Sequence, residues 1–493
     1  MSSLFQPAIN LGCRFFFKWG FLAYIAILPI AGTIAFRNIL LISLLLLFIY
    51  FIVESKSDLR GSIATIAPWA YWFFSLYVLL FTSLISSDSS AAFSSLRSQW
   101  GPALLSWIIG AGAVFILRKN DLTSKELTIA AGFLVGVHLL ETMAAWSGLL
   151  GLHVQSYMTL SSMWEGFLSI LRDGYQWPPE SGIPWMFRGF DLMHGNVGNT
   201  GLQTLLIITA FYSSQKSTRK VILYAISVSL IFLSFIISGS RGSVVFGLAM
   251  LLVALLITAN GRLINVYLMI RKKLVHIGLV GLVLIGSILI SASYNSRWNV
   301  TLIAKKSQLA ASIDDPLYFI CEGKVRIDNQ SQQDRTSSHE VITHESIEGD
   351  GARLLLMRAG LSLVMQNPWG LDGSRQSYEK LITSYCGHSP ALSYAHAHQG
   401  WMNVALALGW IGAALYALLF LEVIYKSLYN LKHDSAVNNP WTLSLLLLSI
   451  FWIIRGFLDS VYQDHFLQMQ GVLLGYLYAR QNLTDHQWLG KSE

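Results

Sequence analysis

The sequence predicts an all-α polytopic membrane protein with about twelve transmembrane helices and one large periplasmic loop. Of its 493 residues, 54% are hydrophobic and only 12% are charged. A soluble domain would carry about twice that fraction of charged residues. Apolar runs of roughly 17–25 residues recur along the chain, and each can cross about 30 Å of hydrocarbon as a helix. Because backbone polar groups in lipid must be satisfied internally, these runs are expected to be helices and not strands.

The apolar runs also predict how the chain is organised. Residues 1–195 are expected to hold five helices and a first long loop, and 196–292 to hold helices six to nine. Residues 293–398 form the large loop between helices nine and ten, and 399–493 hold the last three helices and a tail. The twelve spans are placed at 20–36, 38–53, 66–86, 100–117, 127–150, 196–212, 221–237, 243–259, 274–292, 399–424, 441–458 and 465–480.

The cationic residues set the expected orientation of these helices. If the N-terminus is cytoplasmic, most lysines and arginines of the connecting segments fall on the cytoplasmic side. The short loops on the other side then hold only Arg37, Arg97 and Arg241. By the positive-inside rule, both termini are expected in the cytoplasm and the large loop outside it, which is the periplasm for a chain in a bacterial inner membrane. The net charge of +7 follows from this topology, so no nucleic acid partner is expected.

Two of the three cysteines, Cys321 and Cys386, fall in the large loop, whereas Cys13 falls on the cytoplasmic side. Disulfides form and persist in oxidising compartments. The loop pair is therefore expected to form a disulfide if that compartment is oxidising, and two unpaired thiols are the alternative.

Three polar residues precede predicted helices on the same side of the membrane. Arg188 precedes helix six, Arg241 precedes helix eight and His398 precedes helix ten. Helix N-termini present free N–H groups and favour anions, and the planar guanidinium suits phosphate oxygens. The same field would keep the imidazole of His398 neutral, as a general base requires. These residues predict a site for a phosphorylated lipid beside a neutral histidine.

Each of these residues also has a structural interpretation. Arg241 could anchor lipid headgroups, Arg188 could be a solvated loop arginine, and His398 could cap its helix. His396 and His398 could bind a metal, but the pair has no nearby carboxylate in the sequence, which makes this interpretation weak.

The segment that begins at His398 resembles the signature of the O-antigen ligases. His398-Gln399 is followed after nine residues by Gly409 and, after two more, by Gly412. The two glycines are expected to allow close helix packing. The superfamily also includes O-antigen polymerases and bacterial O-oligosaccharyltransferases.

Further segments resemble the same family. Arg241, in a Ser-Arg-Gly triplet, resembles its second arginine motif, and Arg188 with Asn196 resembles its first arginine loop. The segment 353–373 resembles the one that precedes the family histidine. Val245 stands where the ligase pattern has leucine, which leaves ligase and polymerase both open.

The resemblance implies a metal-independent, inverting glycosyltransferase that uses no cofactor. Its donor would be a glycan on undecaprenyl diphosphate, and the ligase acceptor would be a sugar hydroxyl of lipid A–core. Arg188 and Arg241 would stabilise the departing diphosphate, and His398 would take the acceptor proton. Further substrate-binding candidates are Arg358, His396 and Asp459.

Several alternatives remain at this stage. The growing glycan could itself be the acceptor, as in an O-antigen or exopolysaccharide polymerase, or a protein could be, as in an O-oligosaccharyltransferase. A polysaccharide or lipid transporter belongs to a different class, and it would need polar residues midway through several helices. The predicted helices hold few of these, chiefly His138, Glu141 and Arg455. Membrane lipids are expected partners in every case.

Overall fold

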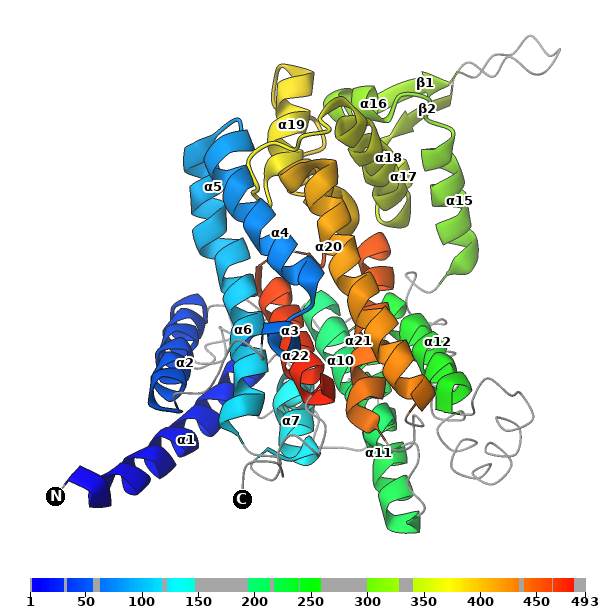
Figure 1. Ribbon diagram of the computed structural model, residues 1–493. Coiled ribbons are helices and arrows are strands. Elements are labelled where there is room, and N and C mark those ends of the chain that lie inside the picture. The colour runs from blue at the N-terminus through cyan, green and yellow to red at the C-terminus, as the bar shows by residue number, and fades with distance from the viewer. Residues whose placement is uncertain are drawn as a thin grey trace, which may run out of the picture.

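Helices make up nearly all of the chain that the computed structural model describes (Figure 1). Among the described helices, six are long and apolar enough to cross a membrane, so the chain is an all-α, multi-pass membrane protein. The six are Ile34–Glu54, Ser89–Ile116, Arg219–Ile236, Arg241–Thr258, Gly400–Lys432 and Pro440–Leu458. The structure describes residues 2–30, 33–55, 63–117, 122–146, 194–212, 217–238, 240–258, 299–327, 340–433, 439–462 and 464–482.

The first part of the chain differs from the predicted spans in several places. The span predicted at 100–117 already begins at Ser89, and the span predicted at 66–86 is interrupted at Pro68. The span predicted at 20–36 is wrong in its limits, because Pro29 interrupts it. Proline has no N–H and disfavours the helical conformation at the residue before it. Two π-helical turns, Phe81–Ile85 and Leu96–Trp100, extend the neighbouring helices. The helices are α1 (Ser2–Ile27), α2 (Ile34–Ser55), α3 (Ile63–Ile66), α4 (Trp69–Leu80), α5 (Ser89–Ser95), α6 (Gly101–Ile116), α7 (Ser124–Ala131) and α8 (Phe133–Trp146).

The remaining bundle helices agree with the predicted spans to within a few residues, apart from a longer α20. The predicted span 274–292 lies outside the described residues. The helices are α10 (His194–Tyr212), α11 (Thr218–Ile237), α12 (Arg241–Thr258), α20 (Gly400–His433), α21 (Pro440–Leu458) and α22 (Asp464–Asn482).

Two central helices of the bundle carry buried polar side chains. α22 packs closely against α6 because Gly471 and Gly475 have no side chains at the contact. A Cβ atom at Gly475 would lie only 2.3 Å from the carbonyl oxygen of Trp107. The amide of Gln468 accepts a hydrogen bond from the buried hydroxyl of Tyr24 at 3.2 Å. On α10, Asn199 is 1% exposed. Such groups are costly inside a membrane unless they are paired, so they indicate a polar interior at this point.

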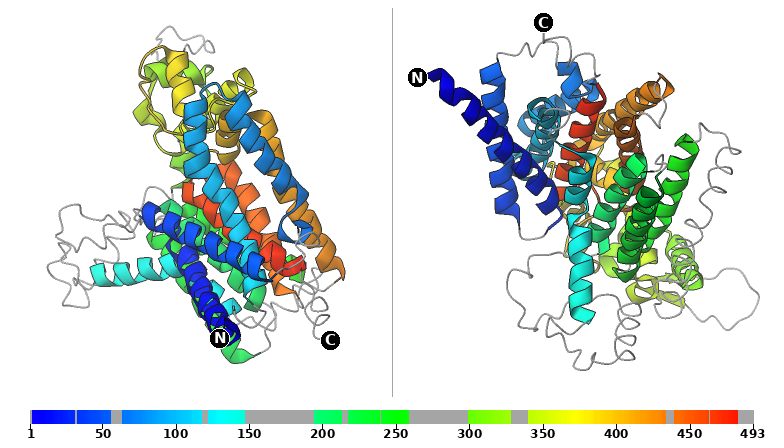
Figure 2. Two further views of the ribbon diagram at one scale, coloured as in Figure 1. Left: turned by 60° about the vertical axis from the view of Figure 1, so that its left-hand side comes forward. Right: turned by 90° about the horizontal axis from the view of Figure 1, so that it is seen from below.

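Residues 299–327 and 340–399, here called the cap, cover one end of the bundle (Figures 1 and 2). Leucines and alanines of α18 pack with α15 and α16 in a core separate from that of the bundle. The strands pair antiparallel, with Lys324 opposite Thr343. The cap elements are α15 (Val300–Ala311), α16 (Pro316–Glu322), β1 (Lys324–Ile327), β2 (Glu340–Thr343), α17 (His344–Ile347), α18 (Asp350–Gln366) and α19 (Ser377–Cys386).

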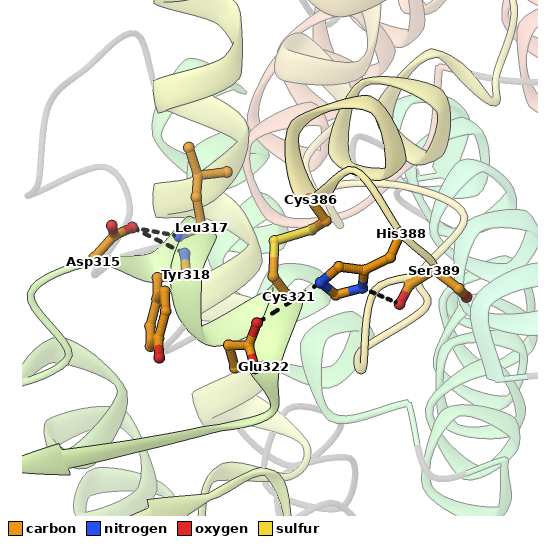
Figure 3. The surroundings of a disulfide bond; sticks show 8 residues. All are labelled: Asp315, Leu317, Tyr318, Cys321, Glu322, Cys386, His388 and Ser389. Atoms are coloured by element: carbon orange, nitrogen blue, oxygen red, sulfur yellow. Dashed lines mark hydrogen bonds and ion pairs between the residues drawn. A yellow bond between two sulfur atoms is a disulfide. The ribbon is translucent and has the colours of Figure 1, made fainter.

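A disulfide joins Cys321 at the end of α16 to Cys386 at the end of α19, as predicted. Figure 3 shows His388 beside it, with its ring between the carboxylate of Glu322 and the carbonyl oxygen of Ser389. The backbone N–H of Leu392 then donates to the carbonyl oxygen of Ile320. The bridge and these contacts fix the path of the chain that leads toward α20.

Candidate active site

His396 and His398 lie in the turn that connects the cap to α20. Their ring centroids are 4.3 Å apart, and the planes are nearly perpendicular. His398 has a φ of 52°, and it is the only described residue other than glycine with a positive φ. Such a conformation costs about 1–3 kcal/mol and persists only where the surroundings impose it. The turn is therefore a strained feature that its neighbours hold in place.

The two glycines of the histidine motif determine how α20 leaves this turn. Gly409 has a φ of 75° and divides α20 into two legs. The segment 367–373 packs into this kink, where the N–H of Trp410 donates to the carbonyl oxygen of Pro368 at 2.9 Å. A Cβ atom at Gly412 would lie 3.0 Å from Cε1 of Tyr77 on α4. Close packing, as expected from the sequence, is thus the role of both glycines.

The end of α21 brings a buried ion pair to the same place. Arg455 is 6% exposed, and its Nη2 atom lies 2.8 Å from Oδ2 of Asp459. Its Nε donates to Oδ1 of Asn199 on α10 at 2.9 Å. A Cβ atom at Gly400 would lie 3.2 Å from the carbonyl oxygen of Asp459, so the first turn of α20 touches this end of α21. Asp459 is thus adjacent to the histidine turn.

Arg241 is the first residue of α12, and its Nη2 atom lies 2.9 Å from Oδ2 of Asp350 on α18. This ion pair joins the bundle to the cap. A Cβ atom at Gly242 would lie 3.1 Å from Nη1 of Arg455, so the start of α12 also reaches the buried ion pair. The structure therefore brings Arg241, Asp459 and the two histidines to one end of the bundle.

Charges from both sides act on this site. Burial lowers the pKa of His396; Asp459 opposes this shift, and Arg353 and Arg375 add to it. The imidazole is thus favoured in its neutral form. Burial alone would raise the pKa of Asp459, but Arg455 and Arg353 outweigh it and hold the pKa below its usual value. Arg353 therefore lies close enough to influence both groups, and its side chain is exposed.

The other predicted residues are not brought into this group by the described contacts. Arg358 points to the end of α15, where its Nη1 donates to the carbonyl oxygens of Ala310 and Ala311 at 2.9 and 3.1 Å. A role for Arg358 in substrate binding stays a prediction. Arg188 lies outside the described residues.

Sequence reasoning missed Arg353 and Asp350 as members of the site. They are three residues apart on α18, a spacing that places two side chains on the same face of a helix. That spacing was visible in the sequence, but nothing in the sequence indicated that this face meets α12. Asn199 was missed although Asn196 and Gln203 lie three residues before and four residues after it, a spacing that places all three on one face of α10.

The arrangement can bind an anion and accept a proton. Arg241, Arg353 and Arg455 contribute three positive charges against the two negative charges of Asp350 and Asp459. A neutral imidazole can act as a general base for a hydroxyl group, and the neutral form is favoured here for His396. Among the described residues, no three side chains of metal-ligating type come together.

Comparison with known proteins agrees with the motif. No curated protein matches this chain. A family model described as O-antigen ligase matches residues 226–417, from α11 through the cap and into α20. This region includes Arg241, the strained histidine turn and the glycine kink. The chain is therefore a multi-pass membrane protein that resembles the O-antigen ligase superfamily over residues 226–417, and this resemblance supports a glycosyltransferase-like activity in general.

Proposed function

We propose that this protein transfers a glycan from undecaprenyl diphosphate to a sugar hydroxyl of lipid A–core, at the periplasmic face of the inner membrane. The observation that carries the proposal is the meeting of His398, Arg241 and the Arg455–Asp459 ion pair at one end of the bundle. The match to the O-antigen ligase family over residues 226–417 supports the reaction class.

In the proposed reaction, the acceptor oxygen attacks the anomeric carbon C1 on the face opposite the diphosphate. The proton of the acceptor hydroxyl passes to the imidazole of His398. The bond from C1 to the diphosphate oxygen breaks, and its electron pair leaves with the diphosphate, so the configuration at C1 inverts. A positioned base of this kind contributes a factor of about 10²–10⁴ to the rate.

The arginines would act on the departing diphosphate. Arg241 sits at the N-terminus of α12, where the helix dipole adds to its charge. Its guanidinium is bound to Asp350, so a diphosphate would exchange with or join that carboxylate. Arg188 remains a second candidate for the same task.

The proposal needs no metal and no cofactor, because the diphosphate leaving group already stores the energy of the transfer. The test is a reconstituted assay with the purified protein in liposomes. Transfer from undecaprenyl diphosphate glycan to rough lipopolysaccharide should continue after treatment with EDTA. Loss of transfer on chelation, restored by a divalent cation, would contradict the metal-independent mechanism.

A polymerase or a protein O-glycosylating enzyme would use the same donor and the same residues. Val245, where the ligase pattern has leucine, is 64% exposed on α12 and does not distinguish them. A deletion strain separates these activities: free carrier-linked polymer indicates a ligase, and single repeat units on lipid A–core indicate a polymerase. If the deletion strain makes normal lipopolysaccharide but its proteins lack the glycan, the enzyme glycosylates proteins.

The proposed orientation has its own test. In Figure 1 the first residues of α1 and the last residues of α22 lie at the end of the bundle opposite the cap. Reporter tags fused near residues 216, 271 and 430 should therefore report cytoplasm, and a tag near 335 should report periplasm. A cytoplasmic signal from the tag at 335 would invert the bundle and remove the proposed site from the periplasm.

A further inference from the structure

Asn403, on the first leg of α20, holds the histidine turn from two directions. Its Oδ1 accepts a hydrogen bond at 3.1 Å from the backbone N–H of Ala397, the residue between the two histidines. Its Nδ2 donates to Oγ of Ser460 at 2.9 Å. One amide therefore ties the backbone of the turn to the segment that follows α21.

Ser460 extends this connection to the imidazole of His396. Ser460 is 4% exposed, and its Oγ lies 3.1 Å from Nδ1 of His396. Because the Ser460 oxygen accepts from Asn403, its hydroxyl hydrogen can be donated to Nδ1. The backbone N–H of Ser460 donates to Oδ1 of Asp459, whose other oxygen binds Arg455. The turn is thus linked to the buried ion pair of the bundle.

This connection acts on a strained part of the chain. His398 directly follows Ala397 and has a φ of 52°. Ala397 is fully buried, and a Cβ atom at Gly360 of α18 would lie 3.0 Å from its side chain. A non-glycine residue relaxes from such a conformation when the contacts that impose it are lost.

We propose that Asn403 and Ser460 are positioning residues that hold the His396–His398 turn in the conformation in which His398 acts as the base. The kinetic tests of this inference rest on the proposed function, whereas its chemical test does not. Neither residue belongs to the histidine-glycine motif, and neither is expected to contact the substrate.

The first test compares Asn403→Ala with Asn439→Ala. Asn439 caps the opposite end of α21 by accepting from the N–H of Thr442, so it is a matched structural asparagine. Transfer is measured in liposomes with undecaprenyl diphosphate glycan and rough lipopolysaccharide, and turnover is divided by the number of donor-binding sites. This normalisation removes the effect of misfolded protein.

We expect Asn403→Ala to lower turnover by about 10–100-fold, because a misplacement of about 1 Å at the reacting atom has an effect of that order. The KM for the donor should stay within about twofold of the wild-type value, since the arginines lie on other elements. Asn439→Ala should keep wild-type turnover. Wild-type turnover in Asn403→Ala, or an equal loss in both variants, would overturn the inference.

The second test needs no transfer activity. Diethyl pyrocarbonate modifies histidines, and mass spectrometry follows the rate at each one. His388, whose contacts are with Glu322 and Ser389, is the internal reference. The rate at His398 relative to His388 should change severalfold in Asn403→Ala and stay unchanged in Asn439→Ala. An unchanged ratio would exclude the positioning role even if the protein proves to have another substrate.

The third test uses Asn403→Asp, which keeps the acceptor for the N–H of Ala397. The new carboxylate would be separated from His396 by the Ser460 hydroxyl, and it favours the protonated imidazole. The other charged or titratable groups that act on or contact His396 are Asp459, Arg353, Arg375 and His398. The pKa of His396 should rise, and a protonated His396 opposes proton transfer to His398. As the pH is lowered, the variant should therefore lose activity earlier than the wild type, with the midpoint of its pH profile at a higher pH. A profile identical to the wild-type profile would contradict the proposed path through Ser460.

Discussion

The bundle and the cap contribute to the site in different ways. On the bundle side, Arg455 is 6% exposed and is bound by both Asn199 and Asp459. On the cap side, Arg353 is exposed and acts on the same groups through space. The Arg241–Asp350 ion pair and the hydrogen bond from the N–H of Ala397 to Oδ1 of Asn403 join the two sides.

The difference indicates a division of labour between the two regions. Charges that are held by buried partners are preorganised, and they can stabilise developing charge without rearrangement. An exposed arginine on the cap can instead follow a substrate as it enters or leaves. The strained histidine turn lies between the two regions, so its geometry depends on both. The predictions below test which contacts set that geometry.

The largest effect is expected for His398→Ala. Removing the base should lower turnover by about 10²–10⁴-fold, while the protein still inserts and still binds donor. The measurement is transfer in liposomes, together with donor binding. His396→Ala is the control, and it should retain activity because the contact of Asn403 with the backbone of the turn remains. Equal loss in both variants would favour a shared structural or metal-binding role.

The second largest effect is expected for Arg241→Lys. Lysine keeps the charge and can pair with Asp350, but it lacks the planar fork that binds two phosphate oxygens. Turnover should fall by about 10²–10³-fold, the usual cost of losing one preorganised donor. Diphosphate analogues should also lose their advantage over monophosphates as competitors of the donor.

Asp350→Asn separates the ion pair from the donor site. This change removes the charge that holds Arg241 in the free enzyme but leaves the guanidinium intact. Turnover should fall much less than in Arg241→Lys. If Asp350→Asn is as damaging as Arg241→Lys, the bridge between cap and bundle is what matters. Wild-type transfer by Arg241→Lys would instead make Arg241 a membrane anchor.

A smaller effect, confined to the cap, is expected from the disulfide. Cys321 and Cys386 are 65 residues apart, and closing a loop of this length stabilises the folded state by at most about 4 kcal/mol. The paired change to serine should therefore expose the cap to protease at a lower temperature and leave the bundle protected. Both thiols should resist labelling until reduced, while labelling of Cys13 should not change on reduction. Free labelling without reductant would exclude the bridge.

Patterns of many residues were predictable from the sequence, whereas single contacts were not. Apolar runs of membrane-spanning length predicted the bundle helices, and two cysteines in one loop predicted the bridge. The glycine spacing predicted close packing but not the kink, because the kink depends on the insertion of segment 367–373. The first span was misplaced because the apolar run continues past Pro29, whereas the helix ends before this proline.

The site shows the same limit. His398 and Arg241 were predicted as site residues because a helix N-terminus gives each a recognisable position. Asp350 and Asn403 become meaningful only when cap and bundle are placed together, and no local pattern reports that placement. Arg358 and Arg353 are five residues apart on α18, and from the sequence either could have been the site arginine. In the structure, Arg358 contacts the end of α15, whereas Arg353 acts on His396 in the histidine turn.

The smallest effect is expected for Arg358→Ala. The guanidinium donates to two carbonyl oxygens at the C-terminal end of α15, where a cation also complements the helix dipole. Its removal should lower the stability of the cap by about 1.5–3 kcal/mol, the usual net value of a hydrogen bond to a charged group. Turnover and the KM for the donor should stay within about twofold of the wild-type values at a temperature where the cap is folded. Thermal unfolding and transfer kinetics, measured on the same liposomes, test these two expectations. A rise in donor KM without a loss of stability would instead place Arg358 in the substrate site, and Arg358 would then have to leave α15 when the donor binds.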